Sequence, residues 1–394
     1  MSSVRVLHLI TRLGPGRCSG LGSAAGTASL LAGSDGSDLL ACGPAGASPC
    51  PASRVEVPHL VRDISWWRDC LAFAELVALL ARLRPAVLHT HTSKAGFLGR
   101  WAAWLVNRTV GRSQPIRTVH TPHGHVLYGY FGPWRSALFR ALEAASSRVT
   151  DRLVAVSEAE ERESLAAGLG EPGQWTVIPA GTGFEPGASG PGGTLARERF
   201  GIPRDAFVAG TVARLEPVKG VRHLIEAAGL VRRKSAVSVR DVRFLVVGDG
   251  SQRPALERLA RDLGLADVVV FAGFQDDAVS LLEAMDVYVQ PSLNEAMGQA
   301  LLSAMARGKP VVAASVCGIT DVVVDGATGL LVPPADPRAL SGAVLRLLED
   351  PLLRRRLGEA GRDLARRRDE TGRPYFGSER TLRLHEELYA GLLP

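Results

Sequence analysis

"PSLNEAMGQALLSAMARGKPVV", residues 291–312, is the stretch from which the fold of this chain can be read. It follows a short β-branched run, DVYVQ, that has the composition of a buried strand. A helix-like apolar run begins near Gly298 and ends at a Gly-Lys-Pro stop. A strand that passes through a turn into a helix is the repeating unit of parallel sheets. Glu295 lies in this turn, where such sheets bind their ligands.

Strands and helices alternate in this way along the whole chain. Short β-branched runs between amphipathic runs of helical length predict parallel sheets with helices on both faces. Asp336-Pro337 is a typical helix start. Every motif below follows a predicted strand, at the edge where such sheets bind ligands. The strand candidates are 4–10, 38–42, 86–90, 116–121, 152–156 and 176–178 in the first half, and 207–212, 243–247, 268–271, 286–290, 310–314 and 330–332 in the second.

A stretch rich in Gly, Pro and Ser, GFEPGASGPGGTLARE at residues 183–198, has the composition of a linker. We therefore expect an α/β protein of two doubly wound Rossmann-like domains that face a central cleft. The domains are expected at residues 1–182 and 199–372. The tail, 373–394, has leucines near helical spacing and predicts a last amphipathic helix.

The composition is that of a folded globular protein, with 46% apolar and 22% charged residues in 394 positions. No apolar run reaches the length of a membrane span, and residues 1–10 lack the h-region and cleavage site of a signal peptide. The five cysteines are scattered without metal-ligand spacing, which favours reduced thiols. These features predict a cytoplasmic protein.

The net charge of +6 is concentrated in the first half of the chain. Residues 1–183 carry 18 Lys and Arg against 13 Asp and Glu, whereas the rest carries 28 against 27. A basic half attracts an anionic membrane leaflet or a diphosphate, although a solvated surface is the simpler interpretation. No nucleic-acid recognition motif is present, and stacking aromatics do not accompany the basic residues, so no nucleic-acid partner is expected.

Two cations, Arg214 and Lys219, lie at a strand-to-helix turn in GTVARLEPVKG, residues 210–220. They can converge on one dianionic group, because a planar Arg fork and a Lys point charge both suit a diphosphate. A pair of ordinary surface cations is the alternative. The glycines of LVVGDGSQR, including Gly248, let backbone approach a ligand or form a tight turn.

Glu295 lies just before a predicted helix amino terminus formed by residues 297–300, which attracts an anion. A carboxylate repels a neighbouring phosphate, so we expect Glu295 to face a neutral polyol. Its alternative role is to complement the helix dipole.

Five of the nine histidines lie in HTHTSKAG, residues 89–96, and TVHTPHGHVLYGY, residues 118–130. Both motifs stand at the ends of predicted strands, which indicates that at least one histidine lines the cleft. His123, followed by Gly124, is best placed to reach a ligand. No Cys or carboxylate joins these histidines at zinc-ligand spacing, so a structural role is the default for each of them.

The order of HTHTSKAG, TPHGH, VARLEPVKG, VVGDG, FAGF, PSLNEAMGQALLSAMARGKPVVA and GATGLLVPP resembles that of the retaining family 4 glycosyltransferases of the GT-B fold. The chain looks most like the bacterial branch that builds capsular, exopolysaccharide and lipid-linked glycans, with residues 85–390 covered strongly. The resemblance implies a last helix that crosses back onto the first domain. It also implies a nucleotide-diphosphate sugar donor, most commonly of UDP, a glycan or polyprenyl-linked acceptor, and no cofactor.

The resemblance implies roles for individual residues. Arg214 and Lys219 match the cations that bind the diphosphate, and no metal is implied because these cations and a helix dipole neutralise the leaving group. Glu295 matches the acid that reaches the donor sugar, and His123 matches a histidine beside that sugar; with the two cations they are the catalytic candidates. Further donor-binding candidates are Gly14, Gly16, Gly248, Phe274, Met297, Gly298, Gln299 and Ser303, and the acceptor-side candidates are His91, Ser93, Lys94 and His125.

The implied mechanism is front-face transfer through an oxocarbenium-like state, in which the phosphate oxygen takes the acceptor's proton. The protein then contributes positioning and charge stabilisation, and domain closure excludes water.

The chain departs from the family pattern at three places. Ser303 stands where the family has a second acid that holds the ribose, and the first loop, LGPGRCSGLGSAAG, lacks a Gly-Gly-Ala start. Ala180 and Gly183 replace a common Asn and Asp. These departures leave open a weakly active paralogue that binds nucleotide-sugar as a partner subunit. A sugar-nucleotide epimerase of the same architecture is a further alternative.

A possible membrane contact lies in FGPWRSALFRALEAASSR, residues 131–148, which predicts a basic amphipathic helix with Trp134, Leu138 and Phe139 among arginines. Such a helix either packs on the core or lies on the cytoplasmic face of the inner membrane.

Overall fold

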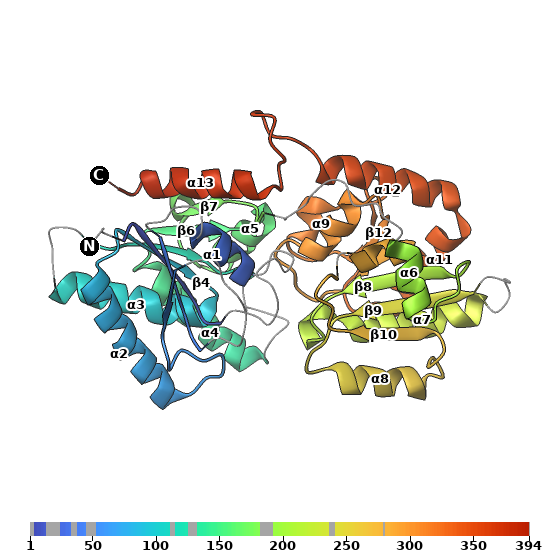
Figure 1. Cartoon of the computed structure of the whole chain (residues 1–394), viewed down its shortest axis with the longest axis horizontal. Coiled ribbons are helices and arrows are strands. Elements are labelled where there is room, and N and C mark those ends of the chain that lie inside the picture. The colour runs from blue at the N-terminus through green and yellow to red at the C-terminus, as the bar shows by residue number, and fades with distance from the viewer. Residues whose placement is uncertain are drawn as a thin grey trace. The chain divides into compact units, whose positions relative to one another are not determined.

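Two compact units make up the chain, one of residues 1–183 with 376–394 and one of residues 184–375. The structure is a computed structural model, and it describes residues 4–12, 24–32, 38–44, 53–110, 115–124, 132–181, 192–235, 241–278 and 280–393. Each unit is built on one parallel sheet with helices packed against it (Figure 1). The expected α/β architecture of two doubly wound units is confirmed.

The sheet of the first unit has seven parallel strands in the order β3-β2-β1-β4-β5-β6-β7. Strand order runs outward in both directions from β1 and β4, which makes their junction the switch point where such sheets bind ligands. Both faces of β1 and β4 are buried, and polar residues interrupt their apolar sequence, which reads VLHLI in β1 and VLHTH in β4. The strands are β1 (Val6–Ile10), β2 (Leu39–Cys42), β3 (Arg54–Glu56), β4 (Val87–His91), β5 (Arg117–Thr121), β6 (Arg152–Ala155) and β7 (Trp175–Val177).

Helices cover both faces of this sheet. On one face, Leu7 and Leu88 pack with Leu76 of α2 and Ala102 of α3. On the other face, the sheet packs against the last helix of the chain. The helices of this unit are α1 (Ala24–Ala32), α2 (Trp66–Leu83), α3 (Ser93–Thr109), α4 (Pro133–Ser147), α5 (Glu158–Ala166), the 3-10 turn η1 (Pro172–Gln174) and α13 (Ser378–Ala390).

The last helix, α13, belongs to the first unit, and Figure 1 shows it lying along that unit. Leu384, Leu388 and the buried Tyr389 pack against strand residues such as Val87. Arg5 of the first strand segment donates hydrogen bonds of 2.5 and 2.8 Å to the carboxylate of Glu386. The predicted amphipathic helix and its return to the first domain are thereby confirmed.

The sheet of the second unit has six parallel strands in the order β10-β9-β8-β11-β12-β13. Its switch point lies between β8 and β11, the counterparts of β1 and β4 in the first unit. The strands are β8 (Phe207–Val212), β9 (Val242–Val247), β10 (Val269–Gly273), β11 (Val287–Gln290), β12 (Val311–Ala314) and β13 (Leu330–Val332).

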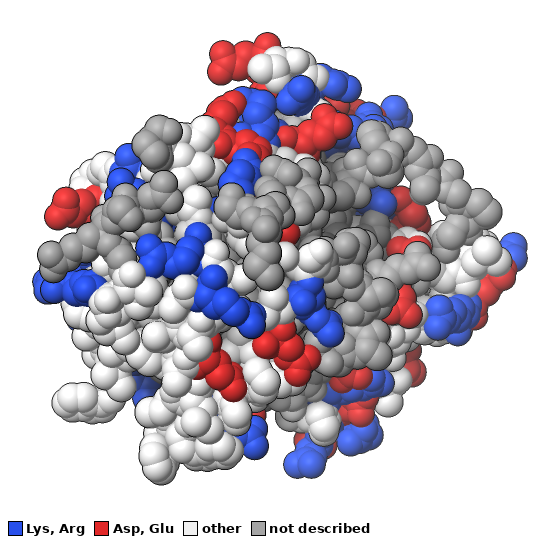
Figure 2. Space-filling model, turned by 60° about the vertical axis from the view of Figure 1, so that its left-hand side comes forward, with Lys and Arg blue, Asp and Glu red and all other residues white. Residues whose placement is uncertain are grey.

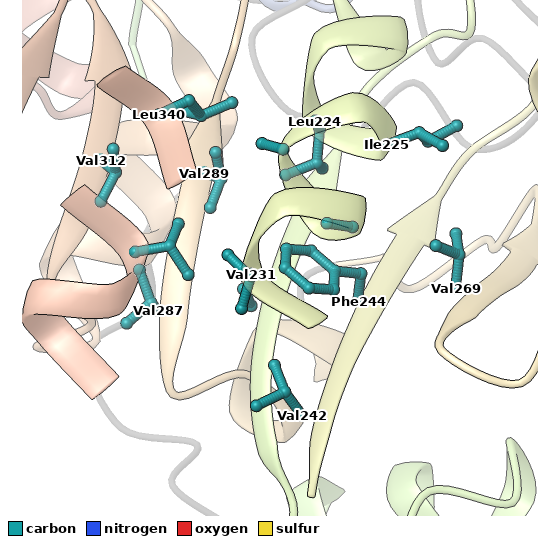
Figure 3. Close-up of a cluster of buried hydrophobic side chains, with 14 of the residues drawn as sticks. Leu224, Ile225, Val231, Val242, Phe244, Val269, Val287, Val289, Val312 and Leu340 are labelled. Carbon is teal, nitrogen blue, oxygen red and sulfur yellow. The ribbon is translucent and has the colours of Figure 1, made fainter. Parts of the chain in front are cut away.

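The core of the second unit lies between its sheet and two amphipathic helices, α7 and α11. Figure 3 shows Val231 of α7 next to Phe244 of β9, and Leu340 of α11 next to Val289 of β11. Asp336 caps α11 by accepting hydrogen bonds from two backbone amides, which confirms the helix start expected there. The helices are α6 (Gly192–Arg199), η2 (Pro217–Lys219), α7 (Val221–Ser235), α8 (Arg253–Asp262), η3 (Ser280–Ala284), α9 (Gln299–Ala306), α10 (Ile319–Val322), α11 (Pro337–Glu349) and α12 (Pro351–Ala365).

The structure differs from the sequence-based expectation at two places. The expected linker, 183–198, contains most of α6, which Arg197 anchors through a 2.9 Å ion pair with Asp286 and a hydrogen bond to the carbonyl of Ala284. The short edge strand β3 was not expected, because its Arg-Val-Glu sequence is mostly charged. Among the described helices, none is both long and apolar enough to cross a membrane.

Candidate active site

An acid and a base meet at the switch point of the second unit. Lys219 lies in η2, after β8, and Glu295 lies after β11. The Lys219 Nζ donates to Glu295 Oε2 at 2.7 Å, and the two side chains are only 17% and 15% exposed. The sequence indicated that Lys219 faces a phosphate and Glu295 a polyol. In the structure they face each other and form an ion pair.

A glycine and a backbone bridge explain why the two turns meet. Gly220 has a φ of 62°, and a Cβ there would lie 2.0 Å from the carbonyl oxygen of Pro291. The amide of Leu293 donates to the carbonyl of Val218 at 2.7 Å. A side chain at position 220 would push the turns apart. The glycine thereby allows Lys219 to reach the turn that carries the acid.

Two polar residues that the sequence analysis did not single out hold Glu295. Gln290 Nε2 donates to Glu295 Oε2 at 3.0 Å, and Ser292 Oγ donates to the same oxygen at 3.2 Å. Gln290 Oε1 in turn accepts a 2.6 Å hydrogen bond from Tyr288, whose pKa is raised by burial and by the Glu295 charge. With Lys219, three donors share Oε2, whereas Oε1 accepts none from the described residues. That second oxygen is available to a ligand hydroxyl.

Arg214 lies in the same turn as Lys219 and has a different environment. Its side chain is exposed and makes no ion pair with the part of the chain that the structure describes. The turn after β9 supports it: Gly248 has a φ of 128°, and a Cβ there would lie 1.9 Å from the carbonyl oxygen of Ala213. Gly248 is thus needed for close packing of two turns, and Arg214 projects from the turn it supports.

The helix that follows Glu295 begins as the sequence predicts. Gly298 is the N-cap of α9, with a φ of 76°, and as a glycine it supplies no side-chain cap. Met297 is buried and Gln299 is half-buried at this end. The amino end of α9 therefore has the geometry of an anion site, because its N-cap residue is a glycine and its first amides point along the helix axis toward that end.

Ser303 and Phe274 differ in how far they reach solvent. Ser303 is fully buried, and its hydroxyl donates to the carbonyl of Gln299 at 2.9 Å within α9. Its hydroxyl is therefore used inside the helix rather than offered to a ribose. Phe274, directly after β10, is 53% exposed and free to contact a ligand.

Histidines at the switch point of the first unit form a hydrogen-bonded row. His8 Nδ1 of β1 lies 3.3 Å from His91 Nε2 of β4. His91 Nδ1 lies 3.0 Å from Nε2 of His123, which follows β5. We call His8, His91 and His123 the histidine row. His8 and His91 are fully buried, and His123 is half-buried at the open end of the row.

His89 and the last helix support the row from one side. The His89 ring lies 4.1 Å from that of His91, centroid to centroid. Its Nδ1 is 2.6 Å from the Tyr389 hydroxyl, and its Nε2 is 2.8 Å from Thr121 Oγ1. His385 of α13 stacks on His89 at 5.5 Å. Residues from opposite ends of the chain therefore build one cluster.

Burial keeps these histidines neutral. It lowers the pKa of His8 and of His123 to about 3 and that of His385 to about 4. The pKa values of His89 and His91 also fall well below the usual value, again mainly through burial. A neutral imidazole has one donor and one acceptor nitrogen, so each ring can pass on a hydrogen bond but carries no charge at pH 7.

A metal ion is the other occupant that such a cluster suggests. The nitrogens of His8, His89 and His91 lie within 4.8 Å of one another. Both nitrogens of His89 are already hydrogen-bonded to hydroxyls, and His8 and His91 bond each other. Metal-ligating histidines usually direct their second nitrogen to a carboxylate, carbonyl or water, which is not the arrangement here. The described residues therefore fit a neutral hydrogen-bonded cluster better than a metal centre.

A buried carboxylate that sequence reasoning missed holds the turn of His123. Glu160 accepts the amide of Gly124 at 2.6 Å and that of Val156 at 2.7 Å. Its own amide donates to Ser157 Oγ, the N-cap of α5. The Ser-x-x-Glu spacing of a capping box was the available signal. His123 itself has a φ of 56°, so the turn holds it in the left-handed region.

The structure places the acceptor-side candidates in different environments. His91 belongs to the histidine row, and Ser93 is half-buried at the start of α3. Lys94 instead turns to α2, where its Nζ lies 2.5 Å from Asp69 Oδ1 and donates to the carbonyl of Asp63. The Lys94 charge, which was expected to face an acceptor, is therefore paired with Asp69. Gly14, Gly16 and His125 lie outside the described residues.

Comparison with protein families covers both units. Residues 194–364 match the family described as glycosyl transferases group 1, and residues 20–181 match the glycosyl transferase 4-like domain.

Curated relatives carry enzyme names. An Escherichia coli UDP-Gal:alpha-D-GlcNAc-diphosphoundecaprenol alpha-1,3-galactosyltransferase is 29% identical over 299 residues, 75% of each chain. A D-inositol 3-phosphate glycosyltransferase of Acidothermus cellulolyticus is 35% identical over 286 residues, 69% of this chain and 61% of the relative.

Solved structures share the fold. Anabaena HepE in complex with UDP and glucose superposes with a TM-score of 0.77 at 22% identity, covering 98% of this chain and all of HepE. Sucrose-phosphate synthase from Thermosynechococcus elongatus gives a TM-score of 0.77 at 24% identity, covering 98% and 99% of the two chains.

Proposed function

Because this chain belongs to the GT-B glycosyltransferases of group 1, we propose that it transfers a hexose or N-acetylhexosamine from a UDP-sugar, with retention and without a metal ion. The acceptor is a glycan or a polyprenyl-linked sugar used in cell-surface polysaccharide synthesis. The name of the Escherichia coli relative, with its UDP-galactose donor and diphosphoundecaprenol acceptor, supports this donor and acceptor class. The putative glycosyltransferase EpsD of Bacillus subtilis, 29% identical over 332 residues, supports glycosyl transfer in general.

The observation that carries the proposal is the Lys219–Glu295 pair at the carboxyl end of β8 and β11. A diphosphate that approaches this end meets the exposed Arg214, the amino end of α9 and the Lys219 ammonium. Glu295 keeps Oε1 available for a sugar hydroxyl, because Oε2 is held by Lys219, Gln290 and Ser292. The anionic diphosphate and the neutral sugar of one donor thus find separate partners within one site.

The proposed reaction needs no residue as a nucleophile. The acceptor oxygen bonds to C1 of the sugar on the face from which the diphosphate oxygen leaves. That phosphate oxygen takes the acceptor's proton, and the nucleoside diphosphate departs. Arg214, Lys219 and the amides of α9 stabilise the charge that grows on the leaving group.

A donor screen tests this proposal. Binding of UDP-, GDP- and ADP-sugars is measured by calorimetry, and transfer is then measured with polyprenyl-diphosphate-linked GlcNAc. We expect binding of a UDP-sugar and a product whose anomeric configuration, determined by NMR, equals that of the donor. An inverted product would refute retention. Nucleotide binding without transfer would favour the partner-subunit alternative, and donor turnover without acceptor would favour an epimerase.

A small cyclitol is a second candidate acceptor. Relatives named for glycosyl transfer to D-inositol 3-phosphate and 2-deoxystreptamine are 35% and 38% identical, over 69% and 39% of this chain. Both cyclitols belong in the acceptor panel, where transfer to one of them and not to the lipid-linked sugar would favour this candidate.

We also propose that α4 contacts an anionic membrane. Trp134 is 90% exposed and Leu138 is 57% exposed, and the exposed Arg135 and Arg140 flank them. On the face shown in Figure 2, Lys and Arg are interspersed with Asp and Glu and do not form one continuous basic field. We therefore base the proposed contact on the side chains of α4 alone. Flotation with anionic but not neutral liposomes, lost in Trp134→Ser, is the expected result; equal flotation with both would argue against it.

A further inference from the structure

Each member of the histidine row has one nitrogen engaged by the next ring. His123 uses Nε2 toward His91, and His91 uses its other nitrogen toward His8. In a chain of neutral imidazoles, every contact needs one N–H and one bare nitrogen. The tautomers of the three rings are therefore coupled, and only two arrangements of the protons satisfy both contacts.

The buried end of the row selects between these two arrangements. His8 Nε2 is buried and has no hydrogen-bond partner among the residues that the structure describes. If it carried the proton, an N–H donor would be buried without an acceptor, which native structures rarely tolerate. A bare nitrogen in that position costs less. The His8 proton is therefore assigned to Nδ1, from which it is donated to His91 Nε2.

The assignment propagates along the row to its open end. Since His91 Nε2 accepts, the His91 proton lies on Nδ1 and is donated to His123 Nε2 at 3.0 Å. We propose that His8 and His91 are positioning residues that hold His123 in its Nδ1–H tautomer. His123 then offers a hydrogen-bond donor at its remaining nitrogen and is unable to act there as a base.

This tautomer fits the reaction of the proposed function, on which its catalytic meaning rests. A hydrogen-bond donor at this end of the first sheet can hold a hydroxyl oxygen or an anionic oxygen of a ligand. A bare nitrogen at the same position would instead accept the proton of a nearby hydroxyl. The lowered pKa values of His8 and His123 keep the row neutral, so His123 keeps its Nδ1–H donor near pH 7.

Nitrogen NMR of histidine-labelled protein tests the assignment directly. In the wild-type spectrum at pH 7 we expect a protonated Nδ1 and a bare Nε2 for His123, identified by the signals that disappear in His123→Asn. In His91→Leu the donor to His123 is lost, so its two nitrogens should shift toward a mixture of tautomers. His91→Asn places an amide donor near the original Nδ1 and should restore the wild-type pattern.

Two further variants distinguish an effect of the histidine row from a general effect on packing. His8→Leu should disturb the signals of both His91 and His123. His120 is a matched control, because it is a buried histidine with a lowered pKa that bonds Thr90 on the other face of the sheet. His120→Asn should leave the His123 tautomer unchanged.

Transfer assays provide a separate readout. We expect His91→Leu to lower transfer by about tenfold to a hundredfold, because the residue that orients His123 is lost. His91→Asn should recover most of the transfer. If the tautomer is as assigned but wild-type protein transfers no sugar, the proposed function fails and the inference stands. A protonated Nε2 on His123, an unchanged pattern in His91→Leu, or a shift of the His8 and His91 signals on addition of Zn²⁺ would overturn the inference.

Discussion

The two switch points of this molecule differ in how they bury polar groups. In the first unit, His8 of β1, His91 of β4 and His123 after β5 are neutral histidines whose nitrogens bond one another. In the second unit, the turns after β8 and β11 carry Lys219 and Glu295, which form an ion pair at 2.7 Å. Both sheets are parallel and place their sites at equivalent strand junctions.

The difference shows two ways to meet the cost of desolvation. A buried charge needs a partner, and the second unit supplies one, with Gln290 and Ser292 as additional donors. A buried imidazole instead loses its proton, and the first unit supplies hydrogen bonds between neutral rings. We infer that the charged pair of the second unit suits a diphosphate sugar, whereas the neutral histidine row of the first unit suits uncharged hydroxyls.

The largest expected effect is that of low pH on the buried histidines of the first unit. The folded-state pKa values of the buried histidines lie below the unfolded value of about 6.5, so the unfolded state binds more protons. The free energy of unfolding should therefore fall as the pH drops from about 6.5 toward about 3, by about 1.4 kcal/mol per pH unit for each such histidine.

Tryptophan fluorescence measures this effect in the first unit alone, because all six tryptophans lie within residues 66–175. Denaturant unfolding at pH 7 and pH 5 should give a clearly lower midpoint at pH 5. Far-UV circular dichroism, which also reports on the second unit, is the control. Equal fluorescence midpoints at the two pH values would contradict the neutral histidine cluster.

Removing one charge of the Lys219–Glu295 pair tests the site of the second unit. Glu295→Gln keeps the shape of the side chain and should lower transfer by about 10²- to 10³-fold, since a charged contact to the reacting donor is lost. Lys219→Met should act similarly, and the double variant should lose less than the sum. Glu216→Gln, in the same turn but bonded to Ser251, is the matched control. Transfer by Glu295→Gln within threefold of wild type would rule out this role.

A smaller change tests the link between α13 and the histidines. Tyr389→Phe removes only the hydroxyl that lies 2.6 Å from His89 Nδ1. We expect the first unit to lose about 1–2 kcal/mol, because a buried nitrogen loses its partner. Tryptophan-detected unfolding measures the loss, and Tyr389→Leu should cost more because it also opens a cavity. If Tyr389→Phe is as stable as wild type, the hydroxyl does not support His89.

The smallest effect is expected at Ser303. Its hydroxyl bonds the carbonyl of Gln299 within α9, and Ala is a better helix former than Ser. Ser303→Ala should therefore change donor affinity by less than about twofold and stability by about 0.5 kcal/mol or less. Calorimetric titration with the donor measures this. A tenfold loss of affinity would mean that the hydroxyl reaches the ribose after all.

Much of the fold was predictable, because local patterns decide secondary structure. The alternation of strands and helices, the cap at Asp336 and the amphipathic last helix all follow from spacing and composition. β3 escaped prediction because its three residues are mostly exposed and carry little apolar signal. The helix in the expected linker escaped because its Gly-rich start resembles a loop.

The sites were predictable in their members but not in their contacts. Glu295 and Lys219 were singled out by position, yet their mutual pairing was not foreseen. His8 was passed over, although a histidine within an apolar strand was a usable signal. Gln290 offered a comparable signal at the end of β11.

By itself, the sequence determined which residues stand at strand ends, because that depends only on neighbours along the chain. The tertiary structure alone decided which of them meet. Lys219 and Glu295 are 76 positions apart, and His8 and His91 are 83 apart. Their contacts depend on strand register, on the close approach that Gly220 permits and on the return of α13. Those are properties of packed elements, and no local pattern encodes them.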